Sequence, residues 1–322
     1  MSNNMNVLVV GAGMMAGEYC KVIKALSYNP IVIGRGEDNA AKLEKEMQIP
    51  ALRGGIEKNL SQVSAAVTHA IVTVNINQLA HITEVLLNAG IKNILVEKPA
   101  GVDFQEIEDL ATLAKIKNSN VYVAYNRRFY ASTQKALEII QADGGVTSFS
   151  FEFTEWGHVI KKTTHPQDVK EKWFLANSTH VVDLAFFLGG FPKEMNSYVQ
   201  GSLDWHKCGS IYAGAGISEK GALFSYQANW SAPGRWSVEV LTQKHRLYLK
   251  PMEKLQVQDI GSVTVELVEI DDKLDLLYKP GLYCETESFL KGYDDGKKIT
   301  IAEQLEHMQF YEKMEGKTYK RT

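Results

Sequence analysis

Residues 6–17 of the chain read NVLVVGAGMMAG, an apolar run followed at once by closely spaced glycines. The run at 7–10 has the length and the β-branched content of a buried strand. Gly11, Gly13 and Ala16 follow the G-x-G-x-x-G/A pattern, which lets a backbone approach a pyrophosphate at the start of a helix. The stretch therefore predicts a dinucleotide site at the beginning of an α/β domain. A glycine turn that binds nothing is the alternative.

The first 125 residues continue this pattern, because short apolar runs alternate with stretches of helical periodicity. Such alternation is typical of a doubly wound parallel sheet, the Rossmann arrangement. We expect strands at 6–10, 30–33, 70–74, 93–97 and 121–125, and helices at 15–26, 40–47, 78–89 and 104–116. Asp103 is the expected cap of the last helix, with Glu106 three residues on.

The second half of the chain has a different pattern. Phe149, Phe151 and Phe153 alternate in the manner of a strand with one buried face. Further strands are expected at 197–201, 210–214, 222–230, 236–241, 245–250 and 262–269, and helices at 129–140, 179–188, 283–291 and 301–314. The sequence thus predicts a Rossmann domain over 1–125, followed over 126–322 by an α+β domain with a mostly antiparallel open sheet.

Composition narrows the function classes. The chain has 322 residues, 45% hydrophobic and 23% charged, with a formal net charge of -3, so nothing favours nucleic acid or an anionic membrane as a partner. No apolar run approaches the ~18 residues of a membrane span, and the start lacks the features of a signal peptide. The three cysteines are scattered without metal-ligand spacing, as in a cytoplasmic protein with reduced thiols and no metal site.

The end of the second expected strand bears on cofactor choice. An NAD-preferring site places an acid there to accept from the ribose hydroxyls, whereas this chain has Gly34 and Arg35. An arginine can pair with a 2′-phosphate and stack on adenine, so NADP(H) is favoured. If Arg35 is only a solvated loop residue, NAD(H) is the alternative.

A second mark lies about 85 residues after the glycine loop. Glu97-Lys98-Pro99 follows the apolar residues 94–96, which places a lysine at the end of a later parallel strand. Open α/β sheets bind their ligands at that edge. The two marks together indicate a nicotinamide-dependent oxidoreductase.

With the glycine loop and the Glu97-Lys98-Pro99 motif taken together, the chain resembles the glucose-fructose oxidoreductase / inositol dehydrogenase / MocA (Gfo/Idh/MocA) family over nearly its whole length. The segments YNRRF at 125–129 and THVVDLAFFLGG at 179–190 also match. The resemblance implies a second domain whose open sheet forms a homo-oligomer, a dimer or a tetramer. It also implies hydride transfer between a nicotinamide and a carbinol or ketone carbon of a sugar, a polyol or a nucleotide-linked sugar.

The resemblance also implies roles for individual residues. Lys98 would hold the reacting oxygen, and His180 would exchange its proton, as an imidazole can near neutral pH. The expected cofactor contacts are Gly11, Gly13, Met14, Met15, Gly34, Arg35, Val74, Asn75, Glu97, Lys98 and Asn126. The expected substrate contacts are Lys98, Arg127, Trp173, Asn177 and His180. Glu97 and Pro99 would fix the strand end, with a cis Lys98–Pro99 bond.

The chain departs from the family pattern before the histidine. The family often has an aspartate four residues earlier, where this chain has Ala176. His180 and Lys98 could suffice, Asn177 could take a binding role, or dehydrogenase chemistry could be lost. A cofactor-binding regulatory protein and an enzyme with tightly held, recycled NAD are therefore alternative functions. Asp183, one turn later, either orients His180 or is a buried structural acid.

Two more positions have alternative interpretations. Of Arg127 and Arg128, we expect one to bind a substrate carboxylate or phosphate and the other to form an ion pair between the domains. His81 is expected to be structural.

Overall fold

The computed structural model describes residues 5–317 of the chain. The chain divides into two compact units. The first comprises the residues up to Asn126 together with 274–306, and the second comprises Arg127–Lys273 and the residues from His307 on. The expected domain ranges, 1–125 and 126–322, differ from this division in two respects, the smaller being that Asn126 belongs to the first unit. Residues 274–306 return to the first unit instead of staying with the second.

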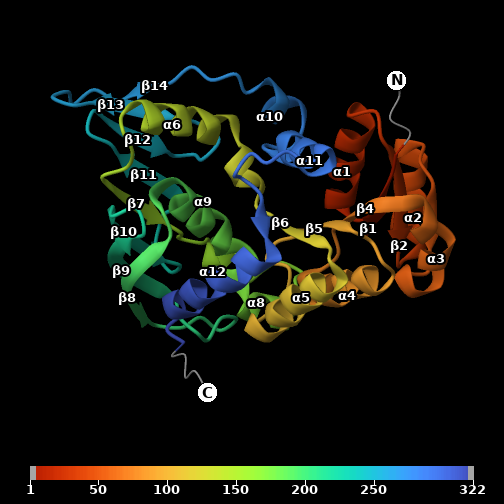
Figure 1. Cartoon of the computed structure of the whole chain (residues 1–322). Coiled ribbons are helices and arrows are strands. Elements are labelled where there is room, and N and C mark those ends of the chain that lie inside the picture. Colours follow the sequence, from red (N-terminus) through yellow and green to blue (C-terminus); the bar gives the residue numbers. More distant parts are fainter. Residues whose placement is uncertain (1–4, 318–322) are drawn as a thin grey trace. The chain divides into compact units, whose positions relative to one another are not determined.

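The first unit contains a seven-stranded sheet in the order β15-β6-β5-β4-β1-β2-β3 (Figure 1). All neighbouring strands are parallel except the short edge strand β15. The predicted doubly wound parallel sheet is confirmed. The strands are β1 (Asn6–Val10), β2 (Asn29–Gly34), β3 (Ala51–Arg53), β4 (Val67–Val72), β5 (Asn93–Glu97), β6 (Asn120–Ala124) and β15 (Ile299–Thr300).

The helices between these strands bury one apolar face each. On α1, Tyr19, Val22 and Ile23 are fully buried at helical spacing. Asp103 caps α5 as expected, since its carboxylate accepts from the backbone N–H of Glu106 at 3.0 Å. The helices of this unit are α1 (Met14–Ala25), α2 (Glu37–Met47), α3 (Ile56–Val63), α4 (Leu79–Asn88), α5 (Phe104–Lys117) and α11 (Leu282–Lys291). Two helices, α10 (Lys273–Leu277) and α12 (Ile301–Met314), run across unit boundaries.

The second unit contains an eight-stranded sheet in the order β14-β13-β12-β11-β7-β10-β9-β8. Only β7 and β10 pair in parallel, so the predicted mostly antiparallel sheet is confirmed. The strands are β7 (Ser148–Glu152), β8 (Pro192–Gln200), β9 (Ile211–Ser218), β10 (Leu223–Asn229), β11 (Ser237–Leu241), β12 (His245–Leu249), β13 (Gln256–Asp259) and β14 (Glu266–Leu267).

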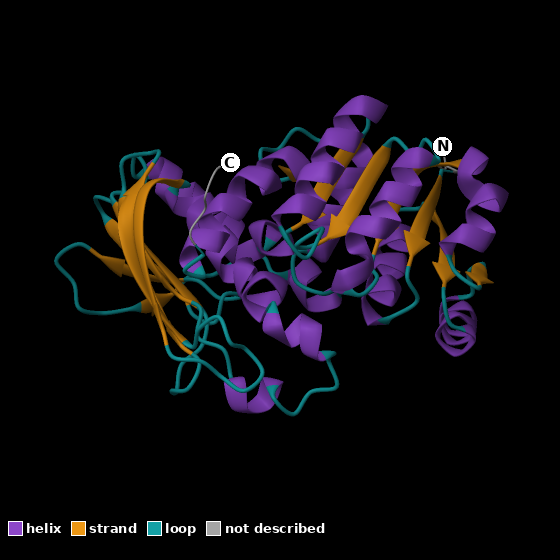
Figure 2. Cartoon of the chain, turned by 90° about the horizontal axis from the view of Figure 1, so that it is seen from below, coloured by secondary structure: helices purple, strands orange, loops and turns teal. Residues whose placement is uncertain are grey.

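One face of this sheet carries the core of the second unit. Phe149, Phe151 and Phe153 are buried there, and Phe186 of α9 packs edge-on against the first two. Figure 2 shows this sheet nearly edge-on, and no described helix of the unit covers its other face. The helices of the unit are α6 (Ala131–Ala142), α7 (Gly157–Ile160), α8 (Gln167–Glu171) and α9 (Thr179–Gly189), which follows the π-helical turn η4 (Phe174–Ser178).

The expected strand at 262–269 is wrong. Most of that segment is loop, only Glu266–Leu267 pairs, and the strand before it is Gln256–Asp259. Val263 is 94% exposed, so the apolar residues of this segment have no core to pack on in the described chain. The expected strand at 70–74 also ends two residues early, because β4 stops at Val72 and Val74 lies in the loop that follows.

Several candidate features are not found in the described part of the chain. None of its helices is long and apolar enough to cross a membrane. No group of three or more metal-ligating side chains occurs among those residues. Cys20 is buried, Cys284 half-buried and Cys208 exposed, and all three are free.

His307 gives the second unit a pH dependence. Its ring is buried and stacks on Phe191 with 3.8 Å between the ring centroids, and burial lowers the pKa of His307 to about 3. Below about pH 6.5 the His307 ring therefore binds a proton in the unfolded chain but stays neutral in the folded chain. The free energy of unfolding consequently falls as the pH falls below that value. Urea unfolding at several pH values should show that His307→Phe removes about 2 kcal/mol of the loss between pH 6.5 and 5. Parallel pH profiles for the two proteins would contradict this assignment.

Candidate active site

The glycine loop is held between the ends of β2 and β4. The backbone N–H of Gly11 donates to the carbonyl of Ile33 at 2.9 Å, and that of Thr73 donates to Val10 at 2.8 Å. Gly11 has a φ of +122°, and a Cβ there would lie 2.5 Å from the Thr73 hydroxyl oxygen. Only glycine fits this turn without displacing β4.

Gly13 precedes the first turn of α1, and a Cβ built on it would meet nothing within 4 Å. The open space belongs to a cavity of about 340 Å³ at the carboxyl ends of β1, β2 and β4. Five of the expected cofactor contacts line it together: Gly11, Gly13, Arg35, Val74 and Asn75. The N–H groups of the first helical turn and the positive end of the helix make this a site for an anion such as a pyrophosphate.

Other expected cofactor contacts lie outside the lining of this cavity. Met14 is exposed on a neighbouring hollow. Gly34 packs against α2, where a Cβ would come within 2.9 Å of the Ala40 Cβ. Asn126 is buried and donates to the carbonyl of Pro280 at 2.9 Å. Met15 and Glu97 both interact with Lys279, another residue of the first unit.

The cavity also has walls that the sequence analysis missed. Gly55, Ile56 and Glu57 line it from the connection between β3 and α3, two elements that were not expected. The Glu57 carboxylate accepts a hydrogen bond from the His81 ring at 3.3 Å. A hydrogen bond from its own backbone N–H and the one from His81 lower the pKa of Glu57. The lining of the cavity thus carries one cation, Arg35, and one anion, Glu57.

The strand end that carries Lys98 is held on both sides. Glu97 accepts from the buried Tyr19 hydroxyl at 3.1 Å, and the carbonyl of Pro99 accepts from the Gln304 side chain at 3.1 Å. The Lys98–Pro99 peptide bond is cis, as expected. Burial raises the pKa of Glu97, while Lys98 and Lys279 oppose this shift. The half-buried Lys98 therefore extends from a backbone that has little freedom to move.

Lys279 is a further cation of the first unit that the sequence analysis missed. Its ammonium lies 2.9 Å from the Met15 sulfur, at the start of α1, and it acts electrostatically on Glu97. Lys279 reaches this place because residues 274–306 return to the first unit. No local pattern in the sequence marks that return.

In the second unit, the half-buried His180 lies beside an aromatic and cationic cluster centred on Trp236. The rings of His180 and Trp236 lie with their centroids 6.2 Å apart. The guanidinium carbon of Arg127 lies 5.1 Å from the Trp236 ring, and that of Arg235 lies 4.5 Å from it. Two guanidinium groups therefore make cation–π contacts with Trp236, beside the histidine that is expected to exchange the proton.

Glu155 is a buried acid in the same unit that the sequence analysis missed. Its side chain accepts from Asn177 at 2.9 Å and from Ser178 at 2.8 Å, which precede His180 by three and two residues, and from Arg235 at 3.1 Å. Burial raises the pKa of Glu155, and the three donors oppose this shift. Although Ala176 lacks a carboxylate, an acid from another element thus reaches the turn that leads into α9.

Asp183 serves a different purpose. Its two carboxylate oxygens accept from Arg128 at 2.7 and 2.8 Å, and both side chains are buried. Burial raises the pKa of Asp183, and Arg128 opposes this shift. The Arg128–Asp183 ion pair lies within the second unit, so it is not the expected pair between the domains.

Trp173 lies apart from the Trp236 cluster. Its ring contacts His165 and Trp205, with centroid distances of 5.3 and 6.3 Å. Asn177 is engaged with Glu155, as described above. Of the expected substrate contacts in this unit, Arg127 and His180 therefore share a common neighbour in Trp236, whereas Trp173 borders a different part of the unit.

The parallel sheet and the glycine loop are typical of a dinucleotide-binding domain. Residues 5–125 match the model of the GFO_IDH_MocA family, described as an oxidoreductase family with an NAD-binding Rossmann fold. This match, which covers the first domain, confirms the resemblance to the Gfo/Idh/MocA family that the sequence predicted. No curated protein matches the chain.

Solved structures resemble the chain over almost its whole length. The UDP-N-acetylglucosamine 3-dehydrogenase GnnA from Acidithiobacillus ferrooxidans is 15% identical, with 97% of each chain covered and a TM-score of 0.75. A levoglucosan dehydrogenase in complex with NADH and L-sorbose is 16% identical, with 97% of this chain and 95% of that chain covered and a TM-score of 0.77. An oxidoreductase from Agrobacterium radiobacter with NAD+, L-tartaric acid and magnesium is 10% identical, with 96% and 95% covered and a TM-score of 0.80. At these identities the likeness establishes the fold.

The open space at Gly13 can be tested directly. Gly13→Val should fold normally, because nothing lies within 4 Å of the added Cβ, but its side chain should fill the space that a pyrophosphate needs. We expect the melting temperature to stay within a few degrees and dinucleotide affinity, measured by NADPH and NADH fluorescence, to fall by at least about tenfold. Gly17→Ala on the same helix, outside this cavity, is the control and should bind as the wild type. Unchanged affinity in Gly13→Val would mean that the pyrophosphate lies elsewhere.

Proposed function

We propose that the chain is an oxidoreductase that prefers NADP(H) and transfers a hydride between the nicotinamide and a carbinol or ketone carbon of a sugar, a polyol or a nucleotide-linked sugar. The observation that carries the proposal is the cavity at Gly11 and Gly13 in a domain of the Gfo/Idh/MocA family. The sugar-type substrate rests on the resemblance and on the names of the similar dehydrogenases.

In this proposal Lys98 and His180 are the catalytic residues. The nicotinamide supplies the hydride chemistry when it is bound. In the oxidative direction the carbinol C–H bond breaks with loss of hydride, the hydroxyl proton passes to the His180 imidazole, and a carbonyl forms. The Lys98 ammonium donates a hydrogen bond to the same oxygen and stabilises its developing negative charge. The hydrogen bonds to Glu97 and Pro99 support this role, because they limit movement of the strand end that carries Lys98.

Glu155 is the proposed positioning residue for this chemistry. It accepts hydrogen bonds from Asn177 and Ser178, which shortly precede His180 in the chain. It also accepts from Arg235, whose guanidinium lies over the Trp236 ring beside His180. A buried acid with three donors fixes the approach to α9 more firmly than an exposed one would. This arrangement supports retained turnover despite Ala176.

Loss of activity in active-site variants tests the catalytic assignment. In a screen of sugars, polyols and nucleotide-sugars with NADP+, Lys98→Met and His180→Asn should each lower kcat by about a hundredfold or more, because each removes a group that acts on the reacting oxygen. NADPH affinity of His180→Asn should stay within about twofold of the wild type, because His180 is not among the expected cofactor contacts. Lys115→Met, at an exposed site on α5, is the control.

The two alternative functions predict other results in the same assays. A regulatory protein would bind the dinucleotide without turnover in the wild type, and full activity in both variants would overturn the catalytic roles. An enzyme with recycled cofactor would retain nicotinamide through purification and show turnover without net NADPH formation.

Arg35 is the proposed reader of the 2′-phosphate. Its side chain lines the cavity at the end of β2, where no acid replaces it. The nearby Glu57 carboxylate works against a second negative charge, so the preference depends on Arg35 being close enough to outweigh it.

Parallel titrations with NADPH and NADH test this preference. The wild type should bind NADPH at least about tenfold more tightly, and Arg35→Ala should remove that difference by weakening NADPH alone. Arg246→Ala, a half-exposed arginine of the second unit, should leave both affinities unchanged. Equal affinities in the wild type would assign the site to NAD(H) instead.

We also propose a cytoplasmic homo-oligomer, a dimer or a tetramer, that uses the outer face of the second sheet. Ile217 and Leu223 pair across β9 and β10 and are exposed on that face, as is Tyr198 on β8. Within the second unit, the segment 260–267 adds large exposed apolar side chains, namely Ile260, Val263, Val265 and Leu267. Apolar surface on this scale is typical of an interface.

A further inference from the structure

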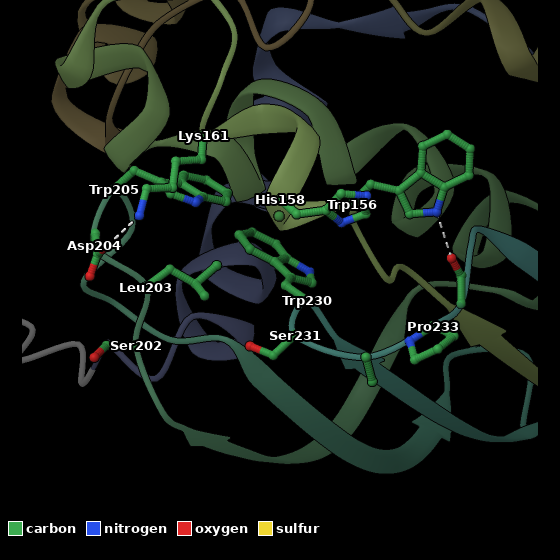
Figure 3. A pocket seen from close by; sticks show the side chains of 13 residues that line it. Trp156, His158, Lys161, Ser202, Leu203, Asp204, Trp205, Trp230, Ser231 and Pro233 are labelled. Atoms are coloured by element: carbon green, nitrogen blue, oxygen red, sulfur yellow. Dashed lines mark hydrogen bonds and ion pairs between the residues drawn. The ribbon is translucent and has the colours of Figure 1, made fainter.

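The second unit holds a larger cavity that the proposed catalytic and cofactor residues do not line. Its volume is about 680 Å³, within the roughly 300–1,000 Å³ of small-molecule sites. Three segments form it: residues 156–161 after β7, 202–205 between β8 and β9, and 230–234 between β10 and β11. Figure 3 shows the side chains that line it.

Three tryptophans give the cavity an aromatic wall. Trp205 and Trp230 stack on each other, with 5.9 Å between centroids and 6° between planes. Trp156 is 49% exposed, yet its indole N–H donates to the carbonyl of Gly234 at 3.0 Å and Arg235 lies over its ring at 5.0 Å. A large indole that is both exposed and fixed in orientation offers a ready-made stacking surface. Its electron-rich face suits the weakly positive C–H groups of a pyranose ring.

Polar groups stand at the other end of the same cavity. The Lys161 ammonium and the Asp204 carboxylate are paired at 2.6 Å, and Ser202, Ser231 and His158 are further polar residues of the lining (Figure 3). Adjacent hydroxyls of a sugar both donate and accept, so a neighbouring acceptor and donor can bind them together. Because the Asp204 carboxylate offsets the charge of Lys161, the pair has no net positive charge to attract a phosphate or carboxylate ligand.

A series of ring contacts connects this cavity to the proposed catalytic histidine within the same unit. Arg235 lies over both Trp156 and Trp236, and the Trp236 ring neighbours His180. A ligand stacked on Trp156 would therefore lie next to the cluster around His180.

We propose that this cavity binds an uncharged pyranose unit, so that the substrate is a disaccharide or a glycoside whose non-reacting sugar stacks on Trp156. The connection to the reaction rests on the proposed function. The binding of a neutral sugar by the cavity does not, because it needs neither cofactor nor turnover.

Calorimetric titration of the full chain without cofactor tests the binding. The probes are cellobiose, maltose, methyl β-D-glucopyranoside and UDP. At least one neutral saccharide should bind with a Kd of about 1 mM or tighter, and Trp156→Ala should weaken it at least about tenfold. Asp204→Asn, at the exposed rim, should weaken saccharide binding severalfold. It tests the cavity independently if Trp156→Ala fails to fold. Tyr293→Ala removes a similarly exposed aromatic (48%) from the first unit and should change nothing.

Three results would overturn the inference: no saccharide binds, the two cavity variants bind as tightly as the wild type, or UDP binds and the saccharides do not. An NADPH titration of the same samples separates this inference from the proposed function. Dinucleotide binding without saccharide binding refutes the cavity assignment alone. Saccharide binding that Trp156→Ala removes, without any dinucleotide binding, refutes the proposed function and leaves the cavity assignment standing.

Discussion

The buried ion pair between Arg128 and Asp183 is the interaction on which the arrangement of the second unit depends most. It ties the segment that follows β6 to the middle of α9 with two parallel hydrogen bonds. The same guanidinium lies 4.6 Å from the ring of Phe187, on the same helix. Removing either partner would leave an uncompensated buried charge, at a cost of about 3–5 kcal/mol. Arg127 directly precedes Arg128, and His180 lies three residues before Asp183. The ion pair therefore also restrains the backbone from which Arg127 and His180 extend.

Much of the first unit could be predicted from the sequence because its signals are local. The strands β1 and β5 have the expected bounds, since each is a buried apolar run that ends at a glycine turn or at Pro99. The short β3 has only three residues and so gives no periodicity to detect. The expected strand at 262–269 failed for the opposite reason: its apolar residues have strand-like character, but the chain provides no core for them.

The candidate site was predicted only where a motif is continuous along the chain. The glycine loop and the Glu97-Lys98-Pro99 turn are such motifs. Gln304 reaches Pro99 from 205 residues away, and no local pattern could assign it. Glu155 had a signal that was overlooked: it continues the alternation of Phe149, Phe151 and Phe153, so an acid falls on the buried side of an apolar pattern. A carboxylate in that position must find donors, and here it finds three.

The return of residues 274–306 to the first unit affects how the protein can be made. The chain passes from one unit to the other three times, so neither unit corresponds to one continuous piece of sequence. During synthesis, residues 1–126 leave the ribosome with the edge of β6 still open, because β15 and Gln304 are made only after the whole sheet of the second unit. The first unit therefore stays incomplete, with the edge of β6 exposed, until β15 and the start of α12 have been synthesised. During that interval the exposed edge can pair with an incorrect strand.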